Sequence, residues 1–253
     1  MKKNILAIVM CSLFASSLFA KADIKLVDEY LKVSGAKEII LALPKQIERG
    51  YLKNIKDEKL KKVDIKASFD SQSALKYVKT KLSDEFSDGL LKSAIAYYKS
   101  PLGSKFKNNG INSMHPKDIQ RRVQYLREIQ KNPPSYQRIN VMNAFVDRLE
   151  LTPVAVHLIG ELLGSINADL MSSNDRDKII GDISNQIRES MLINSLYAYH
   201  DFTDKELKTV IEYYYTNAGR FEQLIVSDVF KQLIMESFSQ IMEQNQIKTA
   251  SKH

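Results

Sequence analysis

The chain of 253 residues contains one cysteine and no tryptophan. The cysteine, Cys11, lies within an apolar N-terminal stretch, so removal of that stretch would leave a protein without thiols. Disulfide bonds, thiolate metal sites and cysteine catalysis are then excluded. A protein without thiols is typical of an oxidising compartment.

Signals of β-structure are also scarce. The chain has nine glycines and six prolines, and it lacks runs in which Val, Ile and Thr alternate with polar residues as they do in strands. Apolar residues recur instead at the spacing of one helix face. The sequence therefore predicts an all-α fold.

Motifs of catalysis and cofactor binding are missing as well. No glycine-rich phosphate loop, dinucleotide fingerprint or Gly-x-Ser-x-Gly turn occurs. The four histidines are too scattered to predict a metal site; they are His115, His157, His200 and His253. His200, Asp201 and Asp204 form the best candidate cluster for such a site. We interpret Asp204 as a helix cap and His200 as the end of the preceding helix. We predict a protein that is not an enzyme, with no catalytic residues, no metal and no cofactor.

The N-terminus has the pattern of a secretory signal peptide. Two lysines after Met1 precede an uncharged stretch from Ile5 to Ala20, and small residues flank Lys21. The apolar run is shorter than the roughly 20 residues of a membrane-spanning helix. We predict a signal peptide over residues 1–22, cleaved after Ala22, export to the periplasm and no membrane span afterwards. An uncleaved N-terminal anchor is the alternative.

Charge is unevenly distributed along the chain. Residues 23–117 hold 19 basic and 12 acidic side chains, whereas residues 118–253 hold 15 and 18. One interpretation is a basic face for anionic lipid, a cell wall polymer or an acidic partner. We favour a solvated helical surface, because acidic residues interrupt the lysines between positions 53 and 66 as surface ion pairs do. No nucleic acid partner is expected in the periplasm.

One segment occurs twice. Residues 86–103 recur as residues 202–219 at a constant offset of 116 positions, with eight identical positions. Each copy carries an apolar stripe at helical spacing; the stripes are Leu91, Ile95 and Tyr98, and Leu207, Ile211 and Tyr214. We infer a tandem duplication in which each copy forms a helix, a sharp corner and a second helix.

The corner is predicted from small and hydroxyl residues. Ser100 is placed to cap the second helix, and Pro101 is tolerated in its first turn. In the second copy Thr216 replaces the serine, and the proline is lost. Gly103 and Gly219 fall in the first turn of the following helix, where a missing side chain permits a neighbouring helix to approach closely.

The expected layout is two tandem helical repeats of about four helices each, packed as one bundle or as two small bundles. Residues 23–110 form the first repeat, 111–150 a helical linker, 151–245 the second repeat and 246–253 a disordered tail. The expected helices are 35–53, 57–81, 87–99 and 101–109, then 153–171, 174–199, 203–215 and 217–245. Residues 108–110 and 132–134 are interpreted as breakers, residues 116–130 as a basic helix, and Ser135 as a cap.

Tyrosines concentrate on or beside the repeated helix. The candidate binding residues are Tyr97, Tyr98, Tyr213, Tyr214 and Tyr215. Exposed tyrosines suit protein interfaces or sugar stacking; the alternative is that each ring is half buried with its hydroxyl at the rim. Tyr215 takes the place of Lys99 in the first copy, so it is the best candidate for the surface.

Residues 97–103, Tyr-Tyr-Lys-Ser-Pro-Leu-Gly, and residues 213–219, Tyr-Tyr-Tyr-Thr-Asn-Ala-Gly, resemble a family of exported bacterial proteins catalogued as domain of unknown function 2059. Its mark is an aromatic pair followed by Ser-Pro-x-Gly at a helix corner, and the second copy departs from it by losing the proline. The resemblance implies an all-helical periplasmic protein without established catalysis, and it assigns no functional residues.

The functional expectation is a non-catalytic helical module that binds another periplasmic or envelope protein. A homodimer is the alternative assembly, because the wide apolar face of the last predicted helix must be buried by something. A carrier or periplasmic chaperone for an apolar ligand is the first alternative function. A cell wall hydrolase that uses two carboxyl groups is the second.

Overall fold

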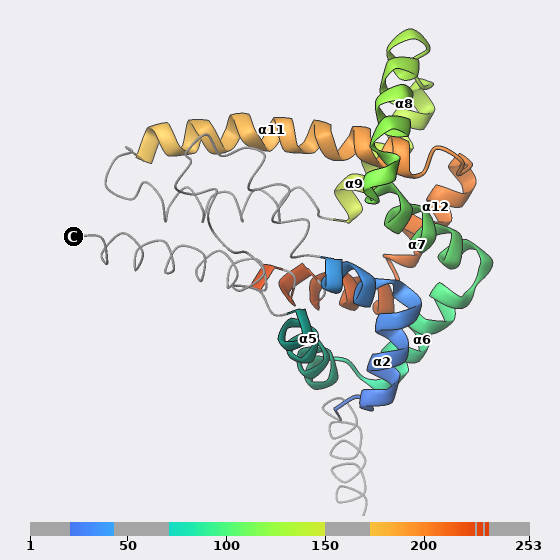
Figure 1. Ribbon diagram of the computed structural model, residues 1–253, viewed down its shortest axis with the longest axis vertical. Coiled ribbons are helices and arrows are strands. Elements are labelled where there is room, and N and C mark those ends of the chain that lie inside the picture. The colour runs from blue at the N-terminus through green and yellow to red at the C-terminus, as the bar shows by residue number, and fades with distance from the viewer. Residues whose placement is uncertain (1–20, 43–70, 150–172, 226, 230, 233–253) are drawn as a thin grey trace, which may run out of the picture. The chain divides into compact units, whose positions relative to one another are not determined.

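The computed structural model describes residues 21–42, 71–149, 173–225, 227–229 and 231–232. Within these ranges the regular structure is helical and no strand occurs, so the predicted all-α fold is confirmed (Figure 1). None of these described helices is long and apolar enough to cross a membrane. The predicted signal peptide up to Ala20, the helix 153–171, the disordered tail and parts of three further predicted helices lie outside the described residues.

The described residues divide into two compact units between Lys99 and Ser100. The first unit contains α2 (Ile24–Ser34), helical residues 36–42, α5 (Ser71–Glu85) and α6 (Asp88–Lys99). Helix α2 packs against both α5 and α6. It ends at Gly35, whose φ of 81° lies in the left-handed region that favours glycine. The fully buried side chains of this unit include Val27, Tyr30, Leu31, Ile40, Leu82, Phe86 and Leu91.

The start of α2 is tied to the rest of the first unit. The Asp23 carboxylate caps the helix by accepting from the backbone N–H of Lys25 at 2.9 Å. The backbone N–H of Asp23 itself donates to Asp88 Oδ1 at 2.9 Å. Ala22, 4% exposed, donates its N–H to the carbonyl oxygen of Ser83 at 2.8 Å. The polypeptide therefore enters this unit in a fixed position.

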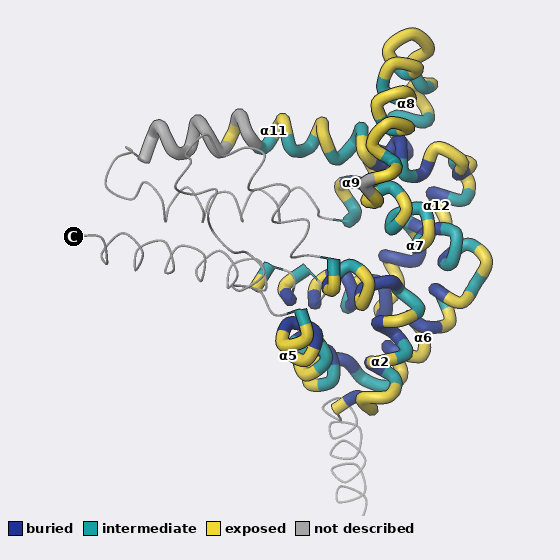
Figure 2. The backbone as a smooth tube through the Cα atoms, in the orientation of Figure 1, coloured by how far each residue is buried: buried dark blue, intermediate teal, exposed yellow. Residues whose placement is uncertain are grey.

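The second unit contains α7 (Pro101–Ser113), a short 3-10 turn η2 (Pro116–Asp118), α8 (Ile119–Lys131), α9 (Tyr136–Arg148), α11 (Ser173–Ala198) and α12 (Asp204–Tyr213). Residues 217–225 are also helical. Helix α9 packs on α11 and α12, and α7 packs on the same two helices. Aromatic rings fill the centre: Phe106 lies 5.1 Å from Tyr199 and 5.9 Å from Phe145 between ring centroids. Figure 2 shows buried segments on the helices of this unit alongside a mostly exposed α8.

Several helix starts are confirmed. Ser100 Oγ accepts from the N–H of Gly103 at 3.1 Å, and Ser135 Oγ accepts from the N–H of Arg138 at 3.1 Å. In the second copy of the repeated segment, Thr216 Oγ1 accepts from the N–H of Gly219 at 3.1 Å. The corner residues therefore cap as their side chains predict.

Three local predictions are wrong. Helix α7 does not break at residues 108–110 but continues to Ser113, because one interior glycine costs a helix only about 1 kcal/mol. A Cβ on Gly110 would lie 3.2 Å from the Tyr199 hydroxyl, so this glycine permits a close contact. Asp204 is not the cap of α12; Thr203 is, in a capping box with Glu206. Helix α12 also ends at Tyr213 rather than at residue 215.

The two copies of the repeated segment share local features but not a packing unit. Leu91 and Leu207 are both 0% exposed, and Phe86 and Phe202 are both buried. The division by packing falls between α6 and α7, inside the predicted first repeat of residues 23–110. The duplication stays a prediction from the sequence.

Candidate functional site

The predicted tyrosines mostly belong to the interior. Tyr98, Tyr213 and Tyr214 are 7%, 8% and 6% exposed, and Tyr97 is half-buried. Tyr97 and Tyr98 belong to the first unit and the other three to the second. The five rings are therefore divided between the two units.

Tyr215 is the exception, since 65% of it is exposed, in line with its predicted place at the surface. The guanidinium of Arg148 lies over its ring, 4.3 Å from the centroid, and also donates to the carbonyl oxygen of Tyr214. The neighbouring Tyr213 donates its buried hydroxyl to Glu222 Oε2 at 2.6 Å. These contacts stabilise the corner after α12, and they leave only one face of one ring for a partner.

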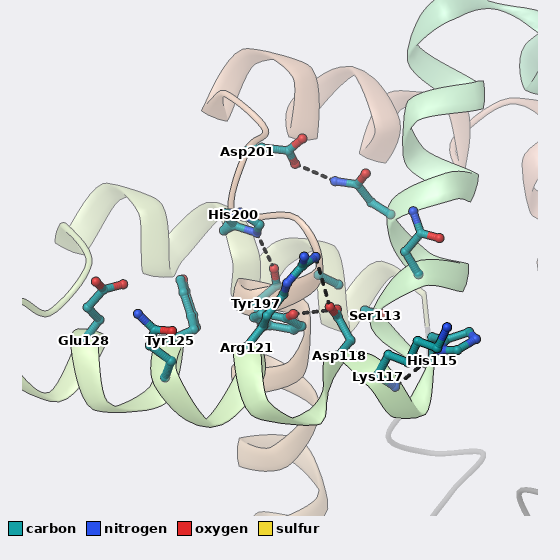
Figure 3. A pocket seen from close by; sticks show the side chains of 14 residues that line it. Ser113, His115, Lys117, Asp118, Arg121, Tyr125, Glu128, Tyr197, His200 and Asp201 are labelled. Carbon is teal, nitrogen blue, oxygen red and sulfur yellow. Dashed lines mark hydrogen bonds and ion pairs between the residues drawn. The ribbon is translucent and has the colours of Figure 1, made fainter.

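A groove in the second unit is the stronger candidate site (Figure 3). Its volume is about 690 Å³, and its walls come from the C-terminal half of α7, from η2 and α8, and from the end of α11 with the loop that follows. Most of the lining is polar; it includes Asn109, Asn112, His115, Lys117, Asp118, Arg121, Gln124, Tyr125, Glu128, Tyr197, His200 and Asp201. Residues more than 70 positions apart in sequence meet here, as the bond from Tyr197 to Asp118 illustrates.

Tyr197 and Asp118 form the floor of the groove. The Tyr197 hydroxyl donates to Asp118 Oδ2 at 2.5 Å, and Arg121 lies 3.6 Å from the other oxygen of the same carboxylate. Burial of the ring, followed by the hydrogen bond to Asp118, raises the pKa of Tyr197 to about 12. At neutral pH the phenol is protonated and acts as a donor.

Three rings line one wall of the groove. Tyr125 lies 5.5 Å from Tyr197 and 5.9 Å from His200 between ring centroids, and Tyr197 and His200 stack at 6.0 Å with an interplanar angle of 14°. His200 Nδ1 donates to the carbonyl oxygen of Tyr197 at 2.7 Å. In the neutral imidazole this leaves Nε2 as an acceptor. The wall therefore offers flat aromatic surface beside a polar ring edge.

Two cations position the loop that carries His200 and Asp201. Arg138 donates to the carbonyl oxygens of Tyr199 and Phe202 at 2.6 and 2.8 Å, and to Asp204 at 3.0 Å. On the other side, Lys105 donates to the carbonyl oxygen of Asp201 at 3.0 Å. It also lies 4.2 Å from the centroid of the Phe202 ring. The rim of the groove is thus fixed by ionic contacts that connect α7, α9 and α12.

The predicted cluster of His200, Asp201 and Asp204 does not converge. Asp204 pairs with Arg138, and the Asp201 carboxylate accepts from Asn109 Nδ2 at 2.5 Å. Within the part of the chain that the structure describes, no group of three His, Cys, Asp or Glu side chains is placed to hold a metal ion.

Sequence reasoning missed the groove because most of its lining comes from the segment predicted as a linker. Lys117, Arg121, Gln124 and Glu128 belong to η2 and α8 and were expected only as a basic helix. The available signal was their spacing of i, i+4, i+7 and i+11, which places residues along one side of a helix. Nothing in that spacing identifies α11 as the opposite wall.

A second, more apolar groove lies between α9 and α12. It measures about 580 Å³ and is lined by Val141, Ala144 and Ile211 among others, with Lys208 and Glu212 at its edge. Tyr136, at the start of α9, is 80% exposed beside it. The groove is open along its length and buries no polar group of its own lining.

Compared with protein family models, with curated proteins and with solved structures, the chain matches none. The resemblance to the exported helical family therefore stays a prediction that rests on the two repeated segments.

Proposed function

We propose that the chain is an exported, non-catalytic helical protein that binds a segment of another envelope protein in the groove of its second unit. The observation that carries the proposal is the composition of the groove wall. Two side-chain amides, from Asn112 and Gln124, share one open volume of about 690 Å³ with aromatic rings and charged groups, while the amide of Asn109 is bonded to Asp201. A side-chain amide donates and accepts at once, as a peptide group does, so it pairs readily with an extended backbone.

The rings and the cations extend the same argument. Tyr125 is half-buried and His200 is exposed, so both offer ring surface to an apolar or aromatic side chain of a bound segment. Arg121, with a side chain 82% exposed, and Lys117 provide cations for a carboxylate of that segment. These are the residue types that recur in protein recognition.

Binding is favoured over hydrolysis of a cell wall polymer, the second alternative. A hydrolase of that kind needs one carboxyl group that gives a proton and a second that acts as base or nucleophile. In this groove Asp118 accepts from Tyr197 and Asp201 accepts from Asn109. These two carboxylates serve as acceptors within the fold, which supports a structural role for them. Glu128 is the third carboxylate of the lining, and it alone does not make the pair that hydrolysis needs.

The first alternative is a carrier or chaperone for an apolar ligand, and the groove between α9 and α12 is the observation that favours it. Its lining is more apolar than that of the first groove. Sites for small apolar ligands normally enclose most of the ligand surface, whereas Tyr136 at this groove is 80% exposed. An open apolar groove suits the side of a partner helix better than a small ligand. A second copy of this chain is the alternative partner.

The test is selection of binding segments from a displayed library of random peptides on the purified protein. Peptides selected on the wild type should bind a Gln124→Ala, His200→Ala double variant at least about tenfold more weakly, because an amide contact and a ring contact are lost. Gln120→Ala is the matched control, since Gln120 is an exposed glutamine of the same helix outside the groove. Fluorescence anisotropy of labelled peptides measures the affinities. Equal affinities for the wild type and the double variant would refute the groove as the binding site.

A further inference from the structure

Helix α8 has two faces, and the groove uses only one of them. Arg121, Gln124, Tyr125 and Glu128 follow i, i+3, i+4 and i+7 spacing and line the groove. At 100° per residue, Ile119, Val123 and Leu126 lie on the opposite side of the helix. No residue of α8, which the structure describes in full, is buried. The described residues therefore leave the side away from the groove at least partly exposed, and Figure 2 shows the exposed and half-buried positions along α8.

That side carries an apolar strip, which we define as Ile119, Val123 and Leu126. Ile119 and Val123 are 51% and 42% exposed, and Leu126 is half-buried. Met114, just before η2, is a further large apolar side chain with 49% exposure. Ile119 and Val123 are one helical turn apart, so their exposed side chains share one side of α8 with Leu126.

Basic side chains border the apolar strip on both sides. By helical geometry Arg122 lies about 60° from Ile119 in one direction and Arg127 about 80° in the other. Arg127 and Lys131 are exposed. The only acidic residue of the helix, Glu128, is on the groove face. The surface that α8 presents away from the groove thus combines apolar side chains with positive charge and contains no carboxylate of its own.

This combination fits a lipid surface better than a folded protein. A stable protein interface buries about 800 Å² on each partner around a well-packed centre, and a strip of three side chains on one helix offers much less. An amphipathic helix at a bilayer needs only shallow insertion of its apolar side, with arginines and lysines attracted to anionic head groups. Each such cation contributes about 1 kcal/mol near an anionic surface.

We propose that α8 is a surface-binding helix for an anionic bilayer. The apolar strip inserts among the lipid head groups, and Arg122 and Arg127, which border the strip, contact lipid phosphates. The groove, on the opposite side of the helix, then faces away from the membrane. The proposal does not depend on what the groove binds.

Co-sedimentation of the purified protein with vesicles tests it. Vesicles of phosphatidylglycerol and phosphatidylcholine in equal parts should bind the protein, and vesicles of phosphatidylcholine alone should not. Ile119→Ser with Val123→Ser should lower the partition coefficient about tenfold. Arg122→Gln with Arg127→Gln should lower it about thirtyfold, from the loss of two cations that contribute about 1 kcal/mol each. Added salt should weaken binding of the wild type.

Matched controls come from other helices of the same unit. Leu224→Ser replaces an apolar side chain that is 60% exposed, and Lys205→Gln with Arg220→Gln removes two exposed cations. Both controls should bind as the wild type does. Because no residue of α8 is buried, the circular dichroism melting curves of the α8 variants should match the wild type.

Two results would overturn the proposal. One is equal binding of the wild type and both α8 variants to the mixed vesicles. The other is no binding to the mixed vesicles in low salt together with binding of an acidic polypeptide that the α8 variants lose, which would identify a protein partner instead.

Discussion

Arg138 is the side chain on which the rim of the groove depends. Its guanidinium, 14% exposed, donates to two backbone carbonyls and to Asp204. Replacement by leucine leaves these acceptors without their donor, and an unsatisfied buried acceptor costs about 1–3 kcal/mol. We expect Arg138→Leu to lower the free energy of unfolding by about 3 kcal/mol, measured by urea denaturation.

The matched control for this prediction is Arg220→Leu. Arg220 is an exposed arginine of the same unit, and surface substitutions usually change stability by less than about 0.5 kcal/mol. If Arg138→Leu unfolds at the same urea concentration as the control, the three contacts of Arg138 carry no net stability.

Tyr197 makes the free energy of unfolding depend on pH in the alkaline range. Burial and the hydrogen bond to Asp118 raise the pKa of its phenol from 10.0 to about 12. The phenol is neutral in both states below pH 10, and its ionisation favours the unfolded state as the pH rises from about 10 to 12. The stabilising contribution is therefore complete below pH 10 and is lost toward pH 12. We expect Tyr197→Phe to show a smaller fall in the free energy of unfolding over this interval.

Absorbance of the phenolate provides the direct measurement for Tyr197. The difference titration between the wild type and Tyr197→Phe should show one phenol that ionises near pH 12. A difference curve with its midpoint near pH 10, the value of an exposed tyrosine, would contradict the assigned contact with Asp118.

Among the elements, the corner after α12 is closely packed around Gly219. A Cβ on Gly219 would lie 2.3 Å from the carbonyl oxygen of Tyr213 and 2.8 Å from the Cα of Tyr214, both backbone atoms that cannot move aside cheaply. The close neighbour is thus the preceding corner of the same chain rather than another helix, which was the predicted reason for the glycine. We expect Gly219→Ala to destabilise the protein by about 2–3 kcal/mol in urea unfolding.

Replacement of Gly181 in α11 should have the opposite effect on stability. Nothing lies within 4 Å of a Cβ built on it, and the residue is an exposed helical position. Gly181→Ala should therefore stabilise the protein by about 0.5–1 kcal/mol through helix propensity. A destabilising Gly181→Ala, or a neutral Gly219→Ala, would contradict the packing described for these helices.

At the level of elements, the sequence predicted well those features that depend on neighbouring residues. The caps at Ser100 and Ser135 depend on residues three positions away, and the helix 174–199 corresponds to α11 (Ser173–Ala198). The errors arose where a distant contact decides the outcome. Helix α7 continues through Gly110, which lies against the distant Tyr199 hydroxyl, and Asp204 pairs with Arg138 instead of capping. The groove could not be predicted, since its floor joins residues 79 positions apart.

At the scale of the whole chain, sequence similarity and packing divide the protein differently. The repeated segments predict two equivalent halves, but α6 and α7, which belong to one copy, fall into different compact units. Equivalent residues can keep equivalent burial, as Leu91 and Leu207 do, while the helices around them differ. A copied segment fixes the spacing of buried side chains on its own helix, and the neighbouring helices are chosen by the rest of the chain.

The contact between Asp23 and Asp88 gives the predicted processing step a physical effect. If the chain is cut after Ala22, the peptide nitrogen of Asp23 becomes a positively charged amine, 2.9 Å from a carboxylate oxygen. A hydrogen bond from a neutral amide to a carboxylate is then replaced by an ion pair between two charged groups. Removal of the leader would place this ion pair at the junction between α2 and α6, and it would also remove the hydrogen bonds that Ala22 makes with Ser83.

Precursor and processed forms should therefore respond differently to one substitution. We expect Asp88→Asn to lower the melting temperature of the chain that begins at Asp23 more than that of the chain that begins at Met1, by the equivalent of about 1 kcal/mol. Differential scanning calorimetry of the four proteins measures this, and equal shifts in both backgrounds would argue against it. Removal of the export signal would then also change the contacts at the start of α2, through the new amine of Asp23.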